Sequence, residues 1–303
     1  VATSGVKLID FEDFNNNSFH ITTELSCKAG DEEFRPDITV LINGLPLAFI
    51  ELKKPHNKEG VINERNRINT RFKNKQFRRF VNISQLLVFS NNMEYEDGIV
   101  EPIFGAFYAT PSYEQVNFNY FREDLNYPVK QTLGIIDEKA ENDLLKDNNL
   151  VVIKNSPEYI TNKQENTPTN RILSSLFSKE RLQFILRYSI AYVEEENTGK
   201  IFYQKHIMRY PQIFATQAIA AKLEAGQNKG IIWHTQGSGK TALAFFNVKH
   251  LTDFYSKKGI IPKFYFIVDR IDLLIQASSE FNNRGLKVNS VNSKQDFIKD
   301  LQV

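Results

Sequence analysis

The stretch that decides the fold runs from Arg35 to Lys53 and reads RPDITVLINGLPLAFIELK. Residues 37–42 and 47–53 have the apolar content of strands. The Asn-Gly-Leu-Pro segment between them, residues 43–46, is a strong turn signal, because Asn and Gly tolerate the positive φ that tight hairpins need. The second run is almost wholly apolar up to Glu51, which favours burial on both faces. The stretch therefore predicts a hairpin whose second strand is buried in a sheet.

Three charged residues mark the open end of this hairpin: Asp37, Glu51 and Lys53. Glu51 and Lys53 are two positions apart in one strand, so they share a face. The position of Asp37 depends on the turn. A regular two-residue loop places Asp37 opposite Ile50, whereas a three-residue loop or a bulge places it opposite Glu51. Both geometries are open at this point.

If the three residues meet, they suit metal-dependent phosphate chemistry. Two carboxylates, with the Leu52 carbonyl as a third ligand, would bind Mg²⁺ through hard oxygen atoms. The metal would activate a water, and Lys53 would orient that water and offset charge on the phosphate. The alternative is an ordinary surface ion pair, although an unpaired charge is costly in so apolar a strand.

Composition sets the limits of the function. A chain of 303 residues suggests about two domains, and 41% apolar and 24% charged residues are typical of a globular protein rather than a disordered, collagenous or membrane chain. Cys27 is the single cysteine, which excludes an internal disulfide framework and a thiolate-rich metal site. No secretion signal follows Val1, and no apolar run reaches the length of a membrane span. We therefore expect a cytoplasmic protein without membrane partners.

Positive charge is concentrated after the hairpin although the net charge is only +2. Residues 53–80 contain ten basic side chains against Glu59 and Glu64. A helical stretch of this kind is a candidate phosphate-contacting face, and its alternative is a solvated helix surface. The basic residues are Lys53, Lys54, Lys58, Arg65, Arg67, Arg71, Lys73, Lys75, Arg78 and Arg79.

Hydrophobic periodicity and turn residues predict the other elements. In the first half we expect strands over 85–90 and 105–108, a helix over 137–147, a connector over 155–170 and a helix over 173–193. In the second half we expect a helix from Pro211 to Gly226, strands over 230–234 and 263–268, and a helix over 244–255 between them. Strand, loop, helix, strand is typical of a parallel α/β sheet. The expected domains are 1–170 and 171–303.

A glycine-rich loop, Thr235-Gln-Gly-Ser-Gly-Lys-Thr241, lies between an expected strand and an expected helix. Backbone N–H groups and a helix N-terminus converge on phosphates at such a point. Gly237 and Gly239 allow close approach of the backbone around Ser238, Lys240 would reach the β- and γ-phosphates, and Thr241 would hold Mg²⁺. The strict phosphate-loop pattern has glycine where this chain has His234, which we interpret as a supporting residue.

The hairpin motifs Arg35-Pro-Asp-Ile38, Asn43-Gly-Leu-Pro-Leu47 and Ile50-Glu-Leu-Lys53 resemble the PD-(D/E)xK nuclease core of the restriction (R) subunit of type I restriction-modification enzymes. The resemblance implies that Asp37 and Glu51 are metal ligands and Lys53 the catalytic lysine. The family's QxxxY element on the next helix is altered here, with Glu64 and Ile68 at its positions.

The loop from His234 to Thr241 is similar to motif I of superfamily 2 helicases, and especially of type I restriction motors. The resemblance implies ATP as a cofactor. Upstream, Tyr210 and Gln212 resemble the adenine-recognition element, as a stacking partner and a base reader. Asp269-Arg270 resembles motif Ia, which contacts the DNA backbone.

Together the resemblances imply a PD-(D/E)xK core, a mixed sheet flanked by helices, followed by an incomplete RecA-like motor lobe. Such an R subunit translocates DNA with ATP, cuts double-stranded DNA with Mg²⁺, and works with separate specificity and methylation subunits. No DExH-type box follows motif Ia, so the chain resembles the N-terminal third or less of a longer subunit. The alternatives are a superfamily 2 repair or defence helicase with a degenerate nuclease domain, and a non-catalytic DNA-binding or assembly module. Metal binding by Asp37 and Glu51 separates the first hypothesis from both.

Overall fold

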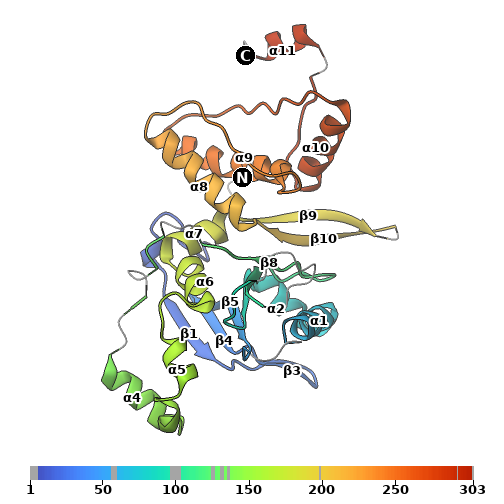
Figure 1. The fold of residues 1–303 in the computed structure, drawn as a ribbon. Coiled ribbons are helices and arrows are strands. Elements are labelled where there is room, and N and C mark those ends of the chain that lie inside the picture. The colour runs from blue at the N-terminus through green and yellow to red at the C-terminus, as the bar shows by residue number, and fades with distance from the viewer. Residues whose placement is uncertain are drawn as a thin grey trace. The chain divides into compact units, whose positions relative to one another are not determined.

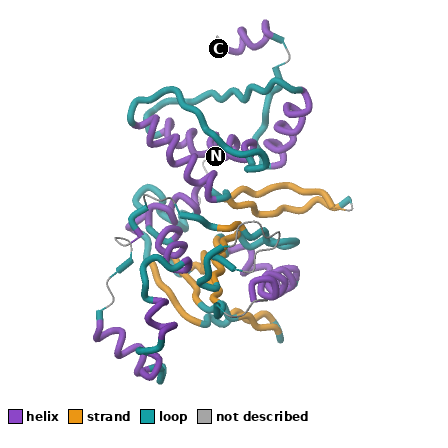
Figure 2. The backbone as a smooth tube through the Cα atoms, viewed as in Figure 1, coloured by secondary structure: helices purple, strands orange, loops and turns teal. Residues whose placement is uncertain are grey.

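The computed structural model describes residues 6–55, 60–95, 104–123, 127–129, 133–134, 137–197, 199–291 and 293–301. The chain forms two compact units, Val1–Ile190 and Ala191–Val303. The division falls after α7 (Lys179–Tyr188), so that helix belongs to the first unit. Figures 1 and 2 show the elements of each unit, which are described separately below.

A mixed sheet is the centre of the first unit. Over the described residues it has six strands in the order β1-β4-β5-β6-β7-β8. β5 and β6 run parallel, whereas the other neighbouring pairs are antiparallel. The strands are β1 (Phe19–Thr23), β4 (Ile38–Ile42), β5 (Leu45–Leu52), β6 (Leu86–Ser90), β7 (Ala106–Ala109) and β8 (Asn119–Tyr120). The strands expected near 37–42, 47–53, 85–90 and 105–108 are thus present, and the coarse α/β class with a mixed sheet is confirmed.

The β4–β5 hairpin combines a two-residue turn with a bulge. Asn43 and Gly44 both have positive φ, 51° and 78°, and Ile42 pairs with Leu45 across them. The register shifts between Val40 and Leu41, so that one extra residue of β5 is accommodated. Beyond the bulge Ile38 pairs with Ile50, which places Asp37 opposite Glu51. Of the two geometries that the sequence left open, the structure has the bulge.

Helices cover both faces of the central strands. α1 (Gly60–Lys73) and α2 (Arg78–Ile83) lie on one face, where the Phe49 ring of β5 is 6.1 Å from the Phe72 ring and 5.2 Å from the Phe80 ring. α6 (Pro168–Leu176) packs against β6 and β7, and the Ser90 and Thr169 hydroxyls are 2.8 Å apart. Residues 47–51 and 86–90 are all buried. The expected burial of the second hairpin strand on both faces is confirmed.

Two expectations for the first unit are wrong. The connector over 155–170 contains α5 (Pro157–Asn162) and the start of α6, because each proline is the first residue of a helix whose preceding Ser156 or Thr167 side chain caps it. The single helix over 173–193 is instead α6, α7 and the start of β9, because Ser178 caps α7 and interrupts the run. The expected helix over 137–147 is present as α4 (Glu138–Asp147). The remaining elements are η1 (Phe14–Asn16), β2 (Cys27–Ala29), β3 (Glu32–Phe34), η2 (Lys75–Phe77) and η3 (Val151–Ile153).

The second unit begins with a pair of strands and continues with helices. β9 (Ile190–Asn197) pairs with β10 (Lys200–Ile207), and α8 (Tyr210–Glu224), α9 (Lys240–Ser256), α10 (Ile271–Asn283) and α11 (Lys294–Leu301) follow. Both helices expected in this half are therefore present. Across the helices that the structure describes, none is long and apolar enough to cross a bilayer.

The strands expected over 230–234 and 263–268 are not formed, which corrects the sequence interpretation. Both segments lie outside regular structure, and Ile231 and Trp233 are 93% and 91% exposed. A strand exists only where a neighbour accepts and donates its backbone hydrogen bonds. Within the described part of the second unit, β9 and β10 form the one strand pair, so neither segment has such a neighbour.

Candidate active site

The end of the β4–β5 hairpin brings Asp37 and Glu51 together. Asp37 immediately precedes β4, and its Oδ2 accepts a hydrogen bond of 2.6 Å from the backbone N–H of Leu52. This bond fixes the Asp37 carboxylate against the end of β5, next to Glu51. The bulge is what makes the contact possible, since the regular register would leave Asp37 opposite Ile50.

Glu51 is a buried carboxyl group in a crowded negative environment. Its residue is 4% exposed, and burial raises its pKa to about 7, with further contributions from the negative charges of Asp37 and Glu64. The positive charges of Lys53 and Arg71 lower the pKa of Glu51, but by less than burial and the negative charges raise it. A cation at this position would therefore relieve an electrostatic cost that the protein's own side chains leave in place.

Lys53 lies between two carboxylates. Its Nζ is 3.7 Å from Glu51 Oε2 and 3.4 Å from Glu64 Oε2. Its backbone N–H donates to the Ser90 carbonyl at 2.9 Å, which continues the β5–β6 ladder one residue past β5. The ammonium is thus held on the same side of the hairpin as Glu51, as their two-residue spacing predicts.

Glu64 is the residue whose part in this cluster the sequence did not reveal. It projects from α1, is 2% exposed, and accepts a 2.9 Å hydrogen bond from Arg67 Nη1 as well as contacting Lys53. On sequence it is only an altered motif position within a basic helix. One feature of the sequence did point to Glu64: it is an acidic residue among many basic ones. Such a residue is well placed to pair with a lysine outside its own helix.

The oxygen atoms at this cluster suit a hard cation, but only two of the predicted ligands are side chains. Carboxylate and carbonyl oxygens are the ligands that Mg²⁺ takes, and Asp37, Glu51 and the Leu52 carbonyl supply them. Among the described residues, no group of three or more His, Cys, Asp or Glu side chains is placed to hold a metal. A metal here would therefore depend on two carboxylates, with backbone oxygen and water completing its coordination.

The glycine-rich loop, residues 235–241, precedes α9, the longest helix of the second unit's described part. Gly237 and Gly239 have φ of 76° and 80°, and the helix begins at Lys240. Lys240 Nζ donates to the Thr235 carbonyl at 3.0 Å and to the His234 carbonyl at 3.4 Å, so the ammonium folds back over its own loop. The loop thus places a helix N-terminus, a lysine and the Thr241 hydroxyl within one short segment.

Gln212 is joined to this loop by hydrogen bonds. It is 3% exposed, its Oε1 accepts from the Arg209 N–H at 2.8 Å, and its Nε2 donates to the Gly239 carbonyl at 2.9 Å. A Cβ atom at Gly239 would lie 2.5 Å from Gln212 Nε2. The amide that resembles a base reader therefore also supports the loop.

The two other motif residues have local partners. The Tyr210 ring lies 5.9 Å from the Phe214 ring in an edge contact. Arg270, of the expected DNA-contacting motif, forms hydrogen bonds with Asp272 at 3.1 and 2.5 Å. Neither contact tests the role that the sequence suggests.

Comparison with known proteins identifies restriction-enzyme sequences at both ends of the chain. Residues 2–96 match the family model described as "Type I restriction enzyme R protein N terminus". Residues 205–301 match the model described as "Type III restriction enzyme, res subunit". The first match contains the hairpin cluster and the second contains the glycine-rich loop.

The individual relatives are named as type I restriction endonuclease subunits. A Methanocaldococcus jannaschii protein, named provisionally as the type I MjaVIIP endonuclease subunit, is 28% identical, covering 98% of this chain and 25% of its own length. The SauCOLORF180P subunit of Staphylococcus aureus is 26% identical over 91% of this chain and 24% of its own length. The HindI subunit of Haemophilus influenzae is 28% identical over 92% and 23%. The chain is therefore similar, over nearly all its residues, to type I restriction R subunits, and spans about a quarter of their length.

Proposed function

We propose that the chain is the nuclease and initial motor part of a type I restriction R subunit, which cuts double-stranded DNA with Mg²⁺ and translocates it with ATP. The observation that carries the nuclease proposal is the bulged register, which brings Asp37 to Glu51 while Lys53 lies 3.7 Å from the Glu51 carboxylate. The family matches and relatives support the same function.

The proposed cleavage chemistry assigns one task to each residue. Asp37, Glu51 and the Leu52 carbonyl hold Mg²⁺, which when bound lowers the pKa of a water and stabilises charge on the scissile phosphate. Lys53 orients that water and offsets the charge that develops on the phosphate oxygens. The hydrogen bond from the Leu52 N–H to Asp37 keeps the first carboxylate in place.

The proposed motor chemistry uses the loop of the second unit. Backbone N–H groups of Gly237, Ser238 and Gly239 bind the ATP phosphates, together with Lys240. Thr241 contributes its hydroxyl to the accompanying Mg²⁺. Gln212 and Tyr210 receive the adenine, for which the Gln212 amide has to exchange at least one of its present partners.

The wider assignments follow from the same proposal. Residues 1–170 form the PD-(D/E)xK nuclease domain and residues 171–303 the first part of a RecA-like lobe. The lobe acquires its parallel sheet when segments 230–234 and 263–268 pair with further strands. Double-stranded DNA and the specificity and methylation subunits are the partners, and the complex acts in the cytoplasm.

Single substitutions in the full-length complex test this proposal. Asp37→Ala or Lys53→Ala should abolish DNA cutting while ATP hydrolysis continues, because the two reactions use separate sites and separate metals. Lys240→Ala, the reciprocal control, should abolish ATP hydrolysis. Equal loss of both activities in Asp37→Ala would show that the cluster has a structural role instead.

A second candidate is a superfamily 2 repair or defence helicase whose nuclease domain has decayed. Glu64 favours it, because this glutamate occupies the altered motif position and already neutralises Lys53 at 3.4 Å. Calorimetric titration with Mn²⁺ separates the two candidates. Uptake that disappears in Asp37→Asn supports the active nuclease, and no uptake supports the degenerate one.

A further inference from the structure

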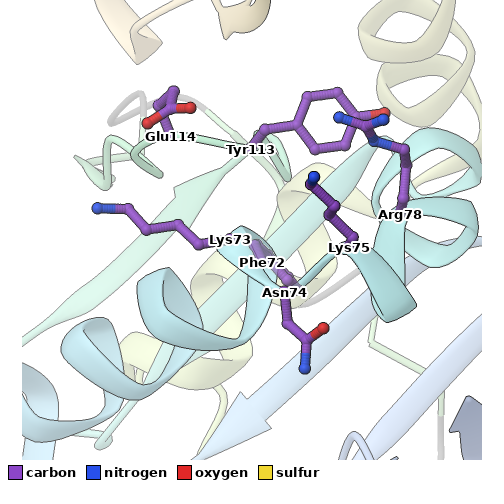
Figure 3. Close-up of a pocket in the computed structure, with 7 residues that line it drawn as sticks. All are labelled: Phe72, Lys73, Asn74, Lys75, Arg78, Tyr113 and Glu114. Atoms are coloured by element: carbon purple, nitrogen blue, oxygen red, sulfur yellow. The ribbon is translucent and has the colours of Figure 1, made fainter. Parts of the chain in front are cut away.

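A basic pocket lies on the first unit at the end of α1. It has a volume of about 200 Å³, and its lining includes Lys73, Lys75 and Arg78 on one side and Tyr113 and Glu114 on the other. The hairpin cluster does not use any of these side chains. In Figure 3, Lys75 and Arg78 point toward the Tyr113 ring, while Lys73 extends toward the segment that carries Glu114.

The pocket has a fixed apolar base. Phe72 is buried in the aromatic core, and Tyr113 packs against that core. The Val116 N–H donates to Asn69 Oδ1 at 2.8 Å, which attaches the segment after Tyr113 to α1. The Arg78 guanidinium carbon is 5.0 Å from the centre of the Tyr113 ring, a cation–π contact that orients its N–H groups. The wall of the pocket is therefore built on ordered residues.

The charge of the pocket points to an anion. The lining contains three cationic side chains and one carboxylate, that of Glu114, and among the ion pairs of the described residues none involves these three cations. All three are exposed, so a ligand can reach them. Guanidinium and ammonium groups over an aromatic base suit the phosphate groups of nucleic acids or nucleotides.

Position along α1 favours DNA over a free nucleotide. Glu64, at the nuclease cluster, and Lys73, at the pocket, lie on the same helix. At 1.5 Å of rise per residue they are separated by about 14 Å along the helix axis. That distance corresponds to about four base pairs of a duplex. A duplex that reaches the cluster and runs along α1 would pass over the pocket as well.

We propose that this pocket, lined by Lys73, Lys75, Arg78 and Tyr113, binds a backbone phosphate of the DNA that the nuclease cluster cuts. The proposal rests on the proposed nuclease function for the identity of its ligand. The pocket would add affinity that does not depend on base sequence and would fix the position of the DNA, but it would not recognise bases.

The test measures duplex binding by the 303-residue chain in EDTA, by fluorescence anisotropy over a range of salt concentrations. The variant Lys73→Gln/Lys75→Gln/Arg78→Gln should bind DNA about tenfold more weakly, with a salt dependence whose slope is shallower by about one for each phosphate no longer bound. The double variant Lys73→Gln/Lys75→Gln, which keeps the Arg78–Tyr113 pair, should have an intermediate affinity.

The matched control removes the same charge elsewhere on the first unit. Lys7→Gln/Lys139→Gln/Lys146→Gln changes three exposed lysines and should alter the affinity by less than about twofold. Equal weakening in both triple variants, or none in the pocket variant, would overturn the proposal. So would loss of ATP affinity with unchanged DNA affinity, since the pocket would then take a free nucleotide.

Failure of the nuclease proposal gives a different result. If cutting by the full-length complex survives Asp37→Ala, the cleavage assignment is wrong, while the anisotropy of the pocket variants still decides whether the pocket binds DNA.

Discussion

Glu64 is a buried carboxylate that lies next to Lys53. Its Oε2 is 3.4 Å from Lys53 Nζ, and its charge contributes to the raised pKa of Glu51. We expect Glu64→Ala to lower DNA cutting by the full-length complex about 10–100-fold, the range typical of residues that orient metal-site groups. Glu64→Gln, which keeps the shape of the side chain, should have a smaller effect.

Arg67→Gln is the control for this prediction, because it removes a second ion-pair partner of Glu64 without changing Lys53. Cutting by Arg67→Gln should stay close to the unaltered rate, and ATP hydrolysis should not change in any of the three variants. Equal cutting by Glu64→Ala and the unaltered enzyme would remove Glu64 from the site.

Gly237 and Gly239, in the glycine-rich loop, allow the cost of backbone strain to be compared with the cost of a steric contact. Gly237 and Gly239 have similar φ, 76° and 80°, but only at Gly239 would a Cβ meet another atom, Gln212 Nε2 at 2.5 Å. Gly237→Ala should cost the second unit about 1–2 kcal/mol through backbone strain alone. Gly239→Ala should cost about 1 kcal/mol more, because it also displaces the Gln212–Gly239 hydrogen bond.

Thermal unfolding of the 303-residue chain measures both costs. In a Gln212→Ala background the difference between the two glycine variants should disappear, since the side chain that meets the new Cβ is absent. A difference that persists there would mean that another neighbour restricts Gly239.

The sequence predicted residue positions only where a simple period applies. Glu51 and Lys53 share a side because strands alternate, and that expectation needs no tertiary information. The place of Asp37 depends on one extra residue in β5, and the regular alternation of a strand does not predict such a bulge. The place of Glu64 depends on how α1 packs against the sheet, which is a long-range property.

At the scale of elements, apolar runs in the sequence predict β4, β5 and β6 correctly. The polar residues that begin helices are harder to interpret. Ser156 and Thr167 lie in the expected connector and Ser178 lies inside an expected single helix, but each one caps a helix. The side-chain oxygen of such a residue satisfies an N–H at the helix start, so the same residue types occur in loops and at helix origins. Pattern alone does not separate these two uses.

β10 contains a lysine whose burial predicts a pH dependence of stability. Lys205 is 8% exposed, and burial lowers its pKa from 10.5 to about 7. Between these values the unfolded chain binds more protons than the folded one, so the free energy of unfolding should rise as the pH rises from about 7 to about 10. Below about pH 7 both states carry the proton, and the folded state bears the full cost of the buried charge.

Lys205→Met should flatten this pH dependence and stabilise the second unit at neutral pH. Urea unfolding of the 303-residue chain at several pH values measures the change, with exposed Lys222→Met as the control. An unchanged pH profile in Lys205→Met would show that other groups dominate the titration.

At the scale of the whole molecule, the proposed nucleotide binding depends on how firmly the glycine-rich loop, residues 235–241, is held. The loop follows segment 230–234, which in the described chain has no strand partner. We therefore expect the 303-residue chain to bind ATP–Mg²⁺ weakly and to hydrolyse it negligibly, with or without DNA. Lys240→Ala should remove the remaining binding, as measured by calorimetry. DNA-stimulated turnover near that of an intact motor would contradict this expectation.

The exposed segments 230–234 and 263–268 also bear on the colloidal behaviour of the chain. Ile231, Trp233 and Ile267 present bare apolar surface on backbone whose N–H and C=O groups have no ladder partner in the described part of the unit. Such stretches on different molecules associate with one another, as unprotected sheet edges do. In concentrated solution the 303-residue chain should consequently cluster through its second unit, and charged substitutions at Trp233 and Ile267 should keep it monodisperse.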